Sequence, residues 1–132
     1  MKNKDINELL QAISLIADVK ATAKFNYAIC KAKNDLESEV KAISETIETI
    51  QKEYSEEEKQ VITKLHNQEI QEDEIQEDIY NSIIEKNKRI NDFVNSTYEG
   101  KEIYKIKLAY VPDNLELKVF NKLMLIIIDE EV

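Results

Sequence analysis

The chain has 132 residues, with 42% hydrophobic and 34% charged content, a formal net charge of −9 and one arginine, Arg89. This length predicts a single domain over residues 1–132. The acidic balance argues against a nucleic-acid backbone or an anionic membrane as the main partner. The charge is concentrated in residues 42–85, where thirteen acidic residues accompany three lysines and the net charge is −10.

A mainly α fold is predicted because residues 1–99 contain neither glycine nor proline, the two strongest helix breakers. Gly100 and Pro112 are the only residues of those types. The first helix is expected over residues 5–18, with Asp5 as its N-cap and Glu8 completing an acidic variant of the capping box. It occupies the N-terminal section, residues 1–22, where Thr22 is a plausible cap for the next helix.

A long antiparallel helical hairpin is predicted over residues 23–97. Apolar residues recur at steps of three and four along residues 23–54, which is the spacing of a coiled-coil seam, and a second stripe follows along residues 74–97. The two stripes would pack against each other. The residues expected to face inward are Leu36, Ile43, Ile50, Ile79, Ile83 and Ile90.

The connection between the two long helices, residues 55–73, has two interpretations. Ser55 followed by Glu58 has the form of a capping box, so a new helix begins at Ser55 in one interpretation. In the other, residues 61–65 continue the seam. The polar residues 66–68 are a candidate turn in either case.

The last section, residues 98–132, is predicted to form one strand and an apolar helix. Tyr104, Ile106, Leu108 and Tyr110 alternate with other residues, as in a strand. A single strand leaves its backbone groups unpaired, so we expect these four residues to pair with a second copy in a homo-oligomer. The alternative is a partner strand within the chain, from residues 19–23 or 123–128. A helix over residues 115–129, capped by Asp113 or Asn114, should be well buried.

No catalytic, cofactor or metal site is predicted. His66 is the only histidine and lacks a carboxylate three residues before it, and Cys30, the only cysteine, has no nearby base. The densest acidic cluster comprises Glu69, Glu72, Asp73, Glu74, Glu77 and Asp78. A solvated charged face is the simpler interpretation of this cluster, and an electrostatic docking surface for a protein partner is the other. No glycine is available there for a calcium loop.

The order of segments resembles a family of small, uncharacterised proteins encoded by bacteriophages and prophages of low-GC bacteria. The segments that carry the likeness are residues 24–31 (KFNYAICK), 36–39 (LESE), 50–56 (IQKEYSE), 91–96 (NDFVNS), 102–108 (EIYKIKL) and 128–131 (IDEE). The family usually has a polar connection where residues 55–73 look helical. The resemblance implies a phage origin, and therefore the host cytoplasm, but it carries over no catalytic residue.

Two functions are compatible with these observations. The first is a non-enzymatic protein that acts by protein–protein contact, through self-assembly or by binding a phage or host protein. The second is a phage counter-defence inhibitor, such as an anti-CRISPR protein, whose acidic residues 42–85 would occupy the basic nucleic-acid groove of a host nuclease or CRISPR effector. The longest strongly apolar run, residues 123–128, is far shorter than the ~20 residues of a membrane span, so an intracellular protein is expected.

Overall fold

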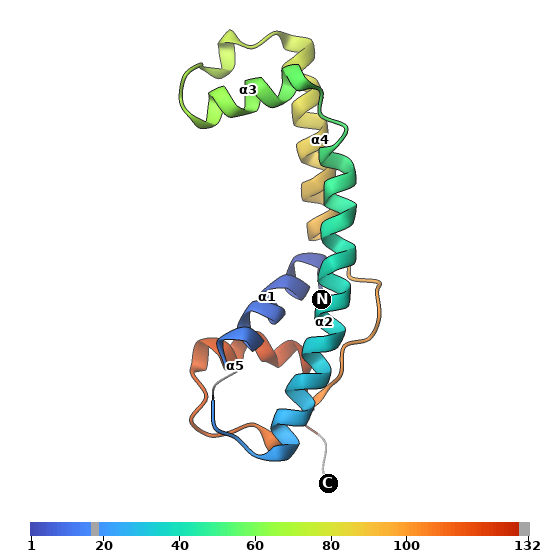
Figure 1. Ribbon diagram of the computed structural model, residues 1–132, viewed down its shortest axis with the longest axis vertical. Coiled ribbons are helices and arrows are strands. Elements are labelled where there is room, and N and C mark those ends of the chain that lie inside the picture. The colour runs from blue at the N-terminus through green and yellow to red at the C-terminus, as the bar shows by residue number, and fades with distance from the viewer. Residues whose placement is uncertain (17–18, 130–132) are drawn as a thin grey trace. The chain divides into compact units, whose positions relative to one another are not determined.

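A computed structural model describes residues 1–16 and 19–129 (Figure 1). The elements are chiefly helices, with one two-stranded sheet among the described residues, which confirms the predicted mainly α class. The chain comprises two compact units: unit 1 is Met1–Ile43 with Thr97–Val132, and unit 2 is Ser44–Ser96. The single domain expected from length stays a prediction, and each unit is described by itself below.

Unit 1 begins with helix α1, Asn3–Leu15, followed by the first part of helix α2, Ala23–Gln51. The start of α1 differs from the prediction, because Asp5 lies in its first turn and accepts a hydrogen bond from the Lys2 backbone N–H at 2.7 Å. Residues 17 and 18, the predicted end of this helix, lie outside the described residues. The predicted Thr22 cap is confirmed, since its hydroxyl accepts the Phe25 N–H at 3.2 Å.

One apolar core holds unit 1 together. Helix α1 contributes residues at helical spacing, α2 contributes Phe25, Leu36 and two small alanines, and helix α5, Leu117–Leu123, packs on α1. Fully buried branched and aromatic side chains of this kind are the main source of folding free energy. The core residues are Ile6, Leu9, Ala12, Ile13, Ile16, Phe25, Ala28, Ala32, Leu36, Ile103, Ile106, Val119, Leu123 and Ile126.

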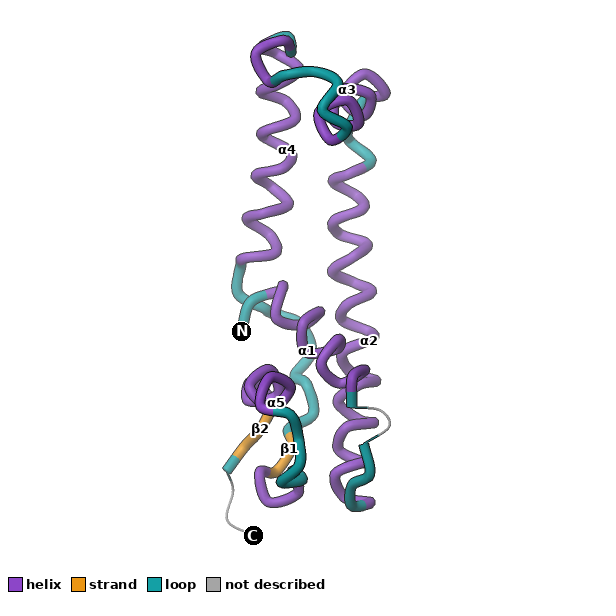
Figure 2. The backbone as a smooth tube through the Cα atoms, turned by 90° about the vertical axis from the view of Figure 1, so that its left-hand side faces the viewer, coloured by secondary structure: helices purple, strands orange, loops and turns teal. Residues whose placement is uncertain are grey.

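The only sheet among the described residues lies in unit 1 and is parallel (Figure 2). Strand β1, Ile106–Lys107, pairs with strand β2, Ile127–Ile128, with Ile106 opposite Ile127. The predicted alternative of a partner strand from residues 123–128 is therefore confirmed. The predicted strand is also shorter than expected, because a 3-10 turn, η2, Leu108–Tyr110, follows β1 directly.

The predicted helix over residues 115–129 is wrong in its second half. Helix α5 ends at Leu123, a 3-10 turn, η3, Met124–Ile126, follows, and the chain then extends as β2. β-Branched isoleucines favour strands, and the pairing satisfies backbone groups of Ile106 that a longer helix would leave open. The predicted burial is also only partial, since Leu117, Met124 and Leu125 are exposed.

Unit 2 contains the end of α2, helix α3, Glu56–His66, a 3-10 turn, η1, Glu72–Glu74, and helix α4, Glu77–Asn95. The predicted cap at Ser55 is confirmed, because its hydroxyl accepts the Glu58 N–H at 3.1 Å. The predicted turn after α3 is confirmed as well, with Gln68 in the left-handed region at φ 59°. Within this unit, the end of α2 and α4 run in opposite directions (Figures 1 and 2).

The residues predicted to line one continuous hairpin seam divide between the two units. Leu36 is buried in the core of unit 1, and Ile83 is buried in unit 2. The other four, Ile43, Ile50, Ile79 and Ile90, are half-buried. The seven-residue repeat thus identifies the inward face of α2 correctly at Leu36, but that face belongs to the core that contains α1.

Candidate functional site

The acidic surface, defined as Glu69, Glu72, Asp73, Glu74, Glu77 and Asp78, lies wholly in unit 2. All six residues are exposed, and none makes an ion pair with another described residue. Glu77 and Asp78 occupy the first turn of α4, where negative charge is favourable to the helix dipole. The structure therefore gives two of these carboxylates a structural role and leaves the other four without one.

The four residues predicted for self-association do not form one exposed face. Ile106 is fully buried, Tyr104 and Leu108 are exposed, and Tyr110 is half-buried. Because β1 already pairs with β2, the unpaired strand on which this prediction rested is absent from the described chain. Self-association itself stays a prediction. Two of the four residues, Tyr104 and Tyr110, instead come together at a pocket.

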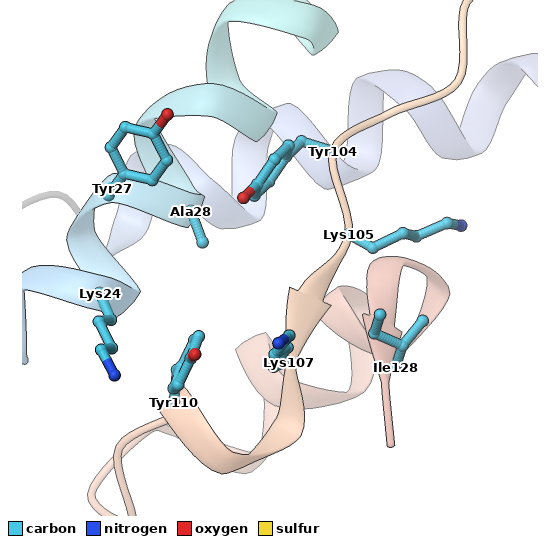
Figure 3. A pocket seen from close by; sticks show the side chains of 8 residues that line it. All are labelled: Lys24, Tyr27, Ala28, Tyr104, Lys105, Lys107, Tyr110 and Ile128. Atoms are coloured by element: carbon cyan, nitrogen blue, oxygen red, sulfur yellow. The ribbon is translucent and has the colours of Figure 1, made fainter. Parts of the chain in front are cut away.

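This pocket, named here the Tyr–Lys pocket, has a volume of about 260 Å³ and lies in unit 1 (Figure 3). Figure 3 shows Tyr27 and Tyr104 on one side with Ala28 between them, Tyr110 on the other side, and Lys105 extending away from the rings. The lining residues come from α2, from the loop before β1, from the two strands and from η2. They are Lys24, Tyr27, Ala28, Tyr104, Lys105, Lys107, Tyr110 and Ile128.

The rings of the Tyr–Lys pocket are surrounded by ammonium groups. The Nζ atoms of Lys24 and Lys107 lie 5.3 and 5.8 Å from the centroid of the Tyr110 ring. A further lysine, Lys31, places its Nζ 5.7 Å from the Tyr27 centroid and 6.0 Å from that of Tyr104. None of these lysines makes an ion pair with a carboxylate in the described chain. Positive charge is therefore available here, although the whole protein is acidic.

The position of Tyr104 is fixed by a segment that we name the strap, residues 98–104. Asp35 of α2 accepts the Tyr104 N–H at 3.0 Å and forms a 2.7 Å ion pair with Lys101. The Lys101 N–H donates to Glu39 at 3.0 Å. The hydrogen bond from Lys101 is the main cause that lowers the pKa of Asp35, so this carboxylate is charged at neutral pH.

Gly100 explains how the strap approaches α2 so closely. A Cβ atom at this position would lie 2.5 Å from Glu39 Oε2 and 2.6 Å from the Tyr98 hydroxyl oxygen. That hydroxyl donates to the Lys101 carbonyl at 2.5 Å. Burial, assisted by the Glu39 charge, raises the pKa of Tyr98 to about 12. A larger residue at this position would therefore require the Glu39 carboxylate or the Tyr98 ring to shift.

Unit 2 has a separate polar cluster around Glu58, a residue that is only 8% exposed. The Lys86 ammonium donates to both carboxylate oxygens, at 3.0 and 2.8 Å, and Ser82 donates at 3.1 Å. Lys86 is the main cause that lowers the pKa of Glu58. Nearby, Tyr54 donates to the Asn87 side chain. These groups satisfy one another, and the contacts of Glu58 with Ser82 and Lys86 join α3 to α4.

The remaining candidates for chemistry belong to different units. Cys30 is exposed on α2, and His66 is exposed in the last turn of α3. No three histidine, cysteine or carboxylate side chains of the described residues are grouped so that they could hold a metal ion.

The sequence analysis missed the pocket residues Lys24 and Tyr27, and it missed Lys31, whose Nζ lies near the Tyr27 ring. Their spacing places them on one face of α2, and residues 104–110 also combine tyrosines with lysines. That shared composition is the signal that could have joined the two segments. The periodicity of each segment alone does not indicate that the two segments meet.

No family model, curated protein or solved structure matches the chain. None of the described helices combines the length and the apolar character that crossing a membrane requires.

Proposed function

We propose that this is a non-enzymatic protein that acts by contact with another protein, and that the acidic surface of unit 2 receives a basic partner. The separation of charge supports this assignment most directly. Unit 2 holds fourteen acidic and six basic residues, a net charge of −8, whereas unit 1 holds thirteen acidic and twelve basic residues. Following the resemblance, we further propose that the partner belongs to a phage or to its bacterial host.

The cost of the acidic surface favours a binding role over a merely solvated face. Six exposed carboxylates close together in sequence repel one another, and these carboxylates have no described basic partner. A basic surface on another protein would relieve that repulsion. It would also accelerate association through long-range attraction, which salt screens.

A second candidate is a counter-defence inhibitor that occupies a nucleic-acid-binding groove. The close succession of exposed carboxylates at Glu72–Glu74 favours it, because a groove that binds a phosphate backbone also attracts a row of negative charges. The two candidate functions differ in whether nucleic acid competes with this protein for the partner. Nucleic acid displaces the protein from its partner only in the second.

The test compares three proteins: the wild type, an acidic-surface variant and a charge-matched control. The acidic-surface variant carries Glu72→Gln, Asp73→Asn, Glu77→Gln and Asp78→Asn. The control removes the same charge from exposed positions of unit 1, through Glu99→Gln, Glu102→Gln, Asp113→Asn and Glu116→Gln. Partners are captured from host lysate, identified, purified and then measured for association rate at low and high salt.

We expect a partner with a basic surface that associates with the wild type and the control at similar rates. The acidic-surface variant should associate at least ~10-fold more slowly at low salt, and the difference should shrink at high salt. Equal association rates for all three proteins at low salt would contradict the proposal.

A further inference from the structure

We propose that the Tyr–Lys pocket of unit 1 binds a small phosphate monoester that carries a planar ring, of which a mononucleotide is the simplest example. The inference goes beyond the proposed function. It concerns the other unit, the opposite charge and a small molecule in place of a protein.

The rings provide the planar half of this site. Tyr27 is 59% exposed and Tyr104 is 40% exposed, so both offer aromatic surface to solvent at the pocket. Their centroids lie 6.3 Å apart with ring planes at 87°, an edge-to-face arrangement that holds each ring in place. Tyr110 closes the opposite side (Figure 3). Aromatic walls of this kind bind planar rings of any base by stacking.

The lysines provide the cationic half of the site, which would bind the phosphate. Three ammonium groups, those of Lys24, Lys31 and Lys107, lie within 6.0 Å of the ring centroids and make no described ion pair. A phosphate monoester carries between one and two negative charges near neutral pH. Lysine binds phosphate as a point charge, which needs no bidentate geometry. Arg89, the only arginine, is in unit 2 and is paired with Glu53.

Size and net charge restrict the ligand to a small molecule. The volume of about 260 Å³ is slightly below the ~300–1,000 Å³ of sites that take drug-sized ligands. It therefore suits one ring system with one phosphate. A long nucleic acid would meet the repulsion of a protein with net charge −9, because that repulsion grows with every phosphate added.

Hydrogen bonds hold the backbone around the pocket in place before any ligand binds. Asp35 fixes the Tyr104 amide, and Lys107 belongs to β1, which is paired with Ile128 of β2. Ala28 offers a small side chain between two of the rings, which leaves room for a ligand. A site assembled in this way loses little conformational entropy on binding.

Calorimetric titration of the full chain with adenosine and uridine 5′-monophosphates tests the proposal. Inorganic phosphate and the free nucleosides are titrated as well, because each represents one half of the mononucleotide. The pocket variant carries Lys24→Gln and Lys107→Gln, and the matched control carries Lys41→Gln and Lys118→Gln at exposed lysines of unit 1 outside the pocket. A third variant, Tyr104→Leu, removes one ring. Circular dichroism checks that each variant is folded.

We expect at least one mononucleotide to bind ~10-fold or more tightly than either of its halves. The pocket variant should lose ~10-fold or more in affinity and the control should match the wild type. Tyr104→Leu should lower the affinity for the mononucleotide but not the affinity for inorganic phosphate. Capture of the acidic-surface partner should stay unchanged in the pocket variant, which separates this proposal from the proposed function.

Several results would overturn the inference. These are no mononucleotide binding at ~1 mM, equal binding of mononucleotide and inorganic phosphate, or equal loss of affinity in the pocket and control variants. Tighter binding of a single-stranded oligonucleotide than of either mononucleotide would also overturn it, by assigning the pocket to a polymer.

Discussion

The two units of this protein are stabilised in different ways, although both are built from amphipathic helices. The described residues of unit 1 include fourteen buried apolar residues in one core. In the described part of unit 2, only Tyr54 and Ile83 are buried apolar residues, and they share the interior with the charged Glu58. Amphipathic periodicity therefore indicates which helix face turns inward but not how much apolar surface is buried there.

This difference has consequences for stability and for function. Apolar burial contributes free energy in proportion to area, whereas a buried ion pair contributes little net stability once desolvation is counted. We therefore expect unit 1 to be the more stable unit and to hold the Tyr–Lys pocket in a fixed geometry. We expect unit 2 to present the acidic surface on a less stable framework.

The largest expected effect comes from the core of unit 1. Leu9→Ala removes a fully buried side chain of α1 and should lower the free energy of unfolding by about 3–5 kcal/mol. Ile83→Ala in unit 2 should cost about 1–3 kcal/mol, because a sparse interior has fewer contacts to lose. Urea titration measures both changes. Leu15→Ala, at a side chain 72% exposed, is the control and should change little. Equal costs for Leu9→Ala and Ile83→Ala would remove the distinction between the units.

A smaller effect is expected at the ion pair of unit 2. Glu58→Leu leaves the Lys86 ammonium without its carboxylate and should destabilise unit 2 by about 1–3 kcal/mol. Adding Lys86→Met should recover much of that loss, because no buried charge then lacks a partner. The double-mutant cycle, followed by thermal unfolding, measures the coupling. A double variant no more stable than Glu58→Leu alone would show that the pair is not the stabilising element.

A local effect is expected at the strap. Gly100→Ala forces Glu39 or Tyr98 to move and should break the hydrogen bond from the Lys101 amide, at a cost of about 1–2 kcal/mol. Glu99→Ala is the neighbouring control, because Glu99 is exposed. Amide exchange over residues 98–104 measures the opening of the strap. Unchanged protection in Gly100→Ala would contradict the role assigned to this glycine.

The smallest expected effect is on pH dependence. The pKa values of Asp35, Glu53 and Glu58 are lowered in the folded protein, chiefly by hydrogen bonds from Lys101, Arg89 and Lys86 respectively. A carboxyl group whose pKa is lower in the folded protein stabilises the fold at pH values above its pKa in the unfolded chain, about 4. That stabilisation is lost as the pH falls through the pKa of the folded protein. Stability should therefore decline below pH ~4. Asp35→Asn should make the free energy of unfolding of unit 1 depend less steeply on pH. Glu58→Gln should do the same for unit 2. An unchanged pH dependence of stability in both variants would contradict the assignment of these carboxylates as stabilising groups.

Features that depend on neighbouring residues were predictable from the sequence, and features that depend on distant ones were not. The cap at Ser55 and the turn near Gln68 follow from local hydrogen bonding and backbone preference. The choice of β2 as the partner of β1 remained one of several alternatives, because periodicity does not identify a partner. The Tyr–Lys pocket was missed for the same reason. Asp35 and Tyr104, whose contact positions one wall, are 69 positions apart.

Native-state hydrogen exchange tests the difference between the two units most directly, because it measures opening free energies segment by segment. We expect the amides of α3 and α4 to exchange through openings that cost less free energy than those of α1. Glu58→Leu should lower the opening free energy of α3 and α4 and leave that of α1 unchanged. A single opening free energy shared by α1, α3 and α4, lowered equally by Glu58→Leu, would contradict the account.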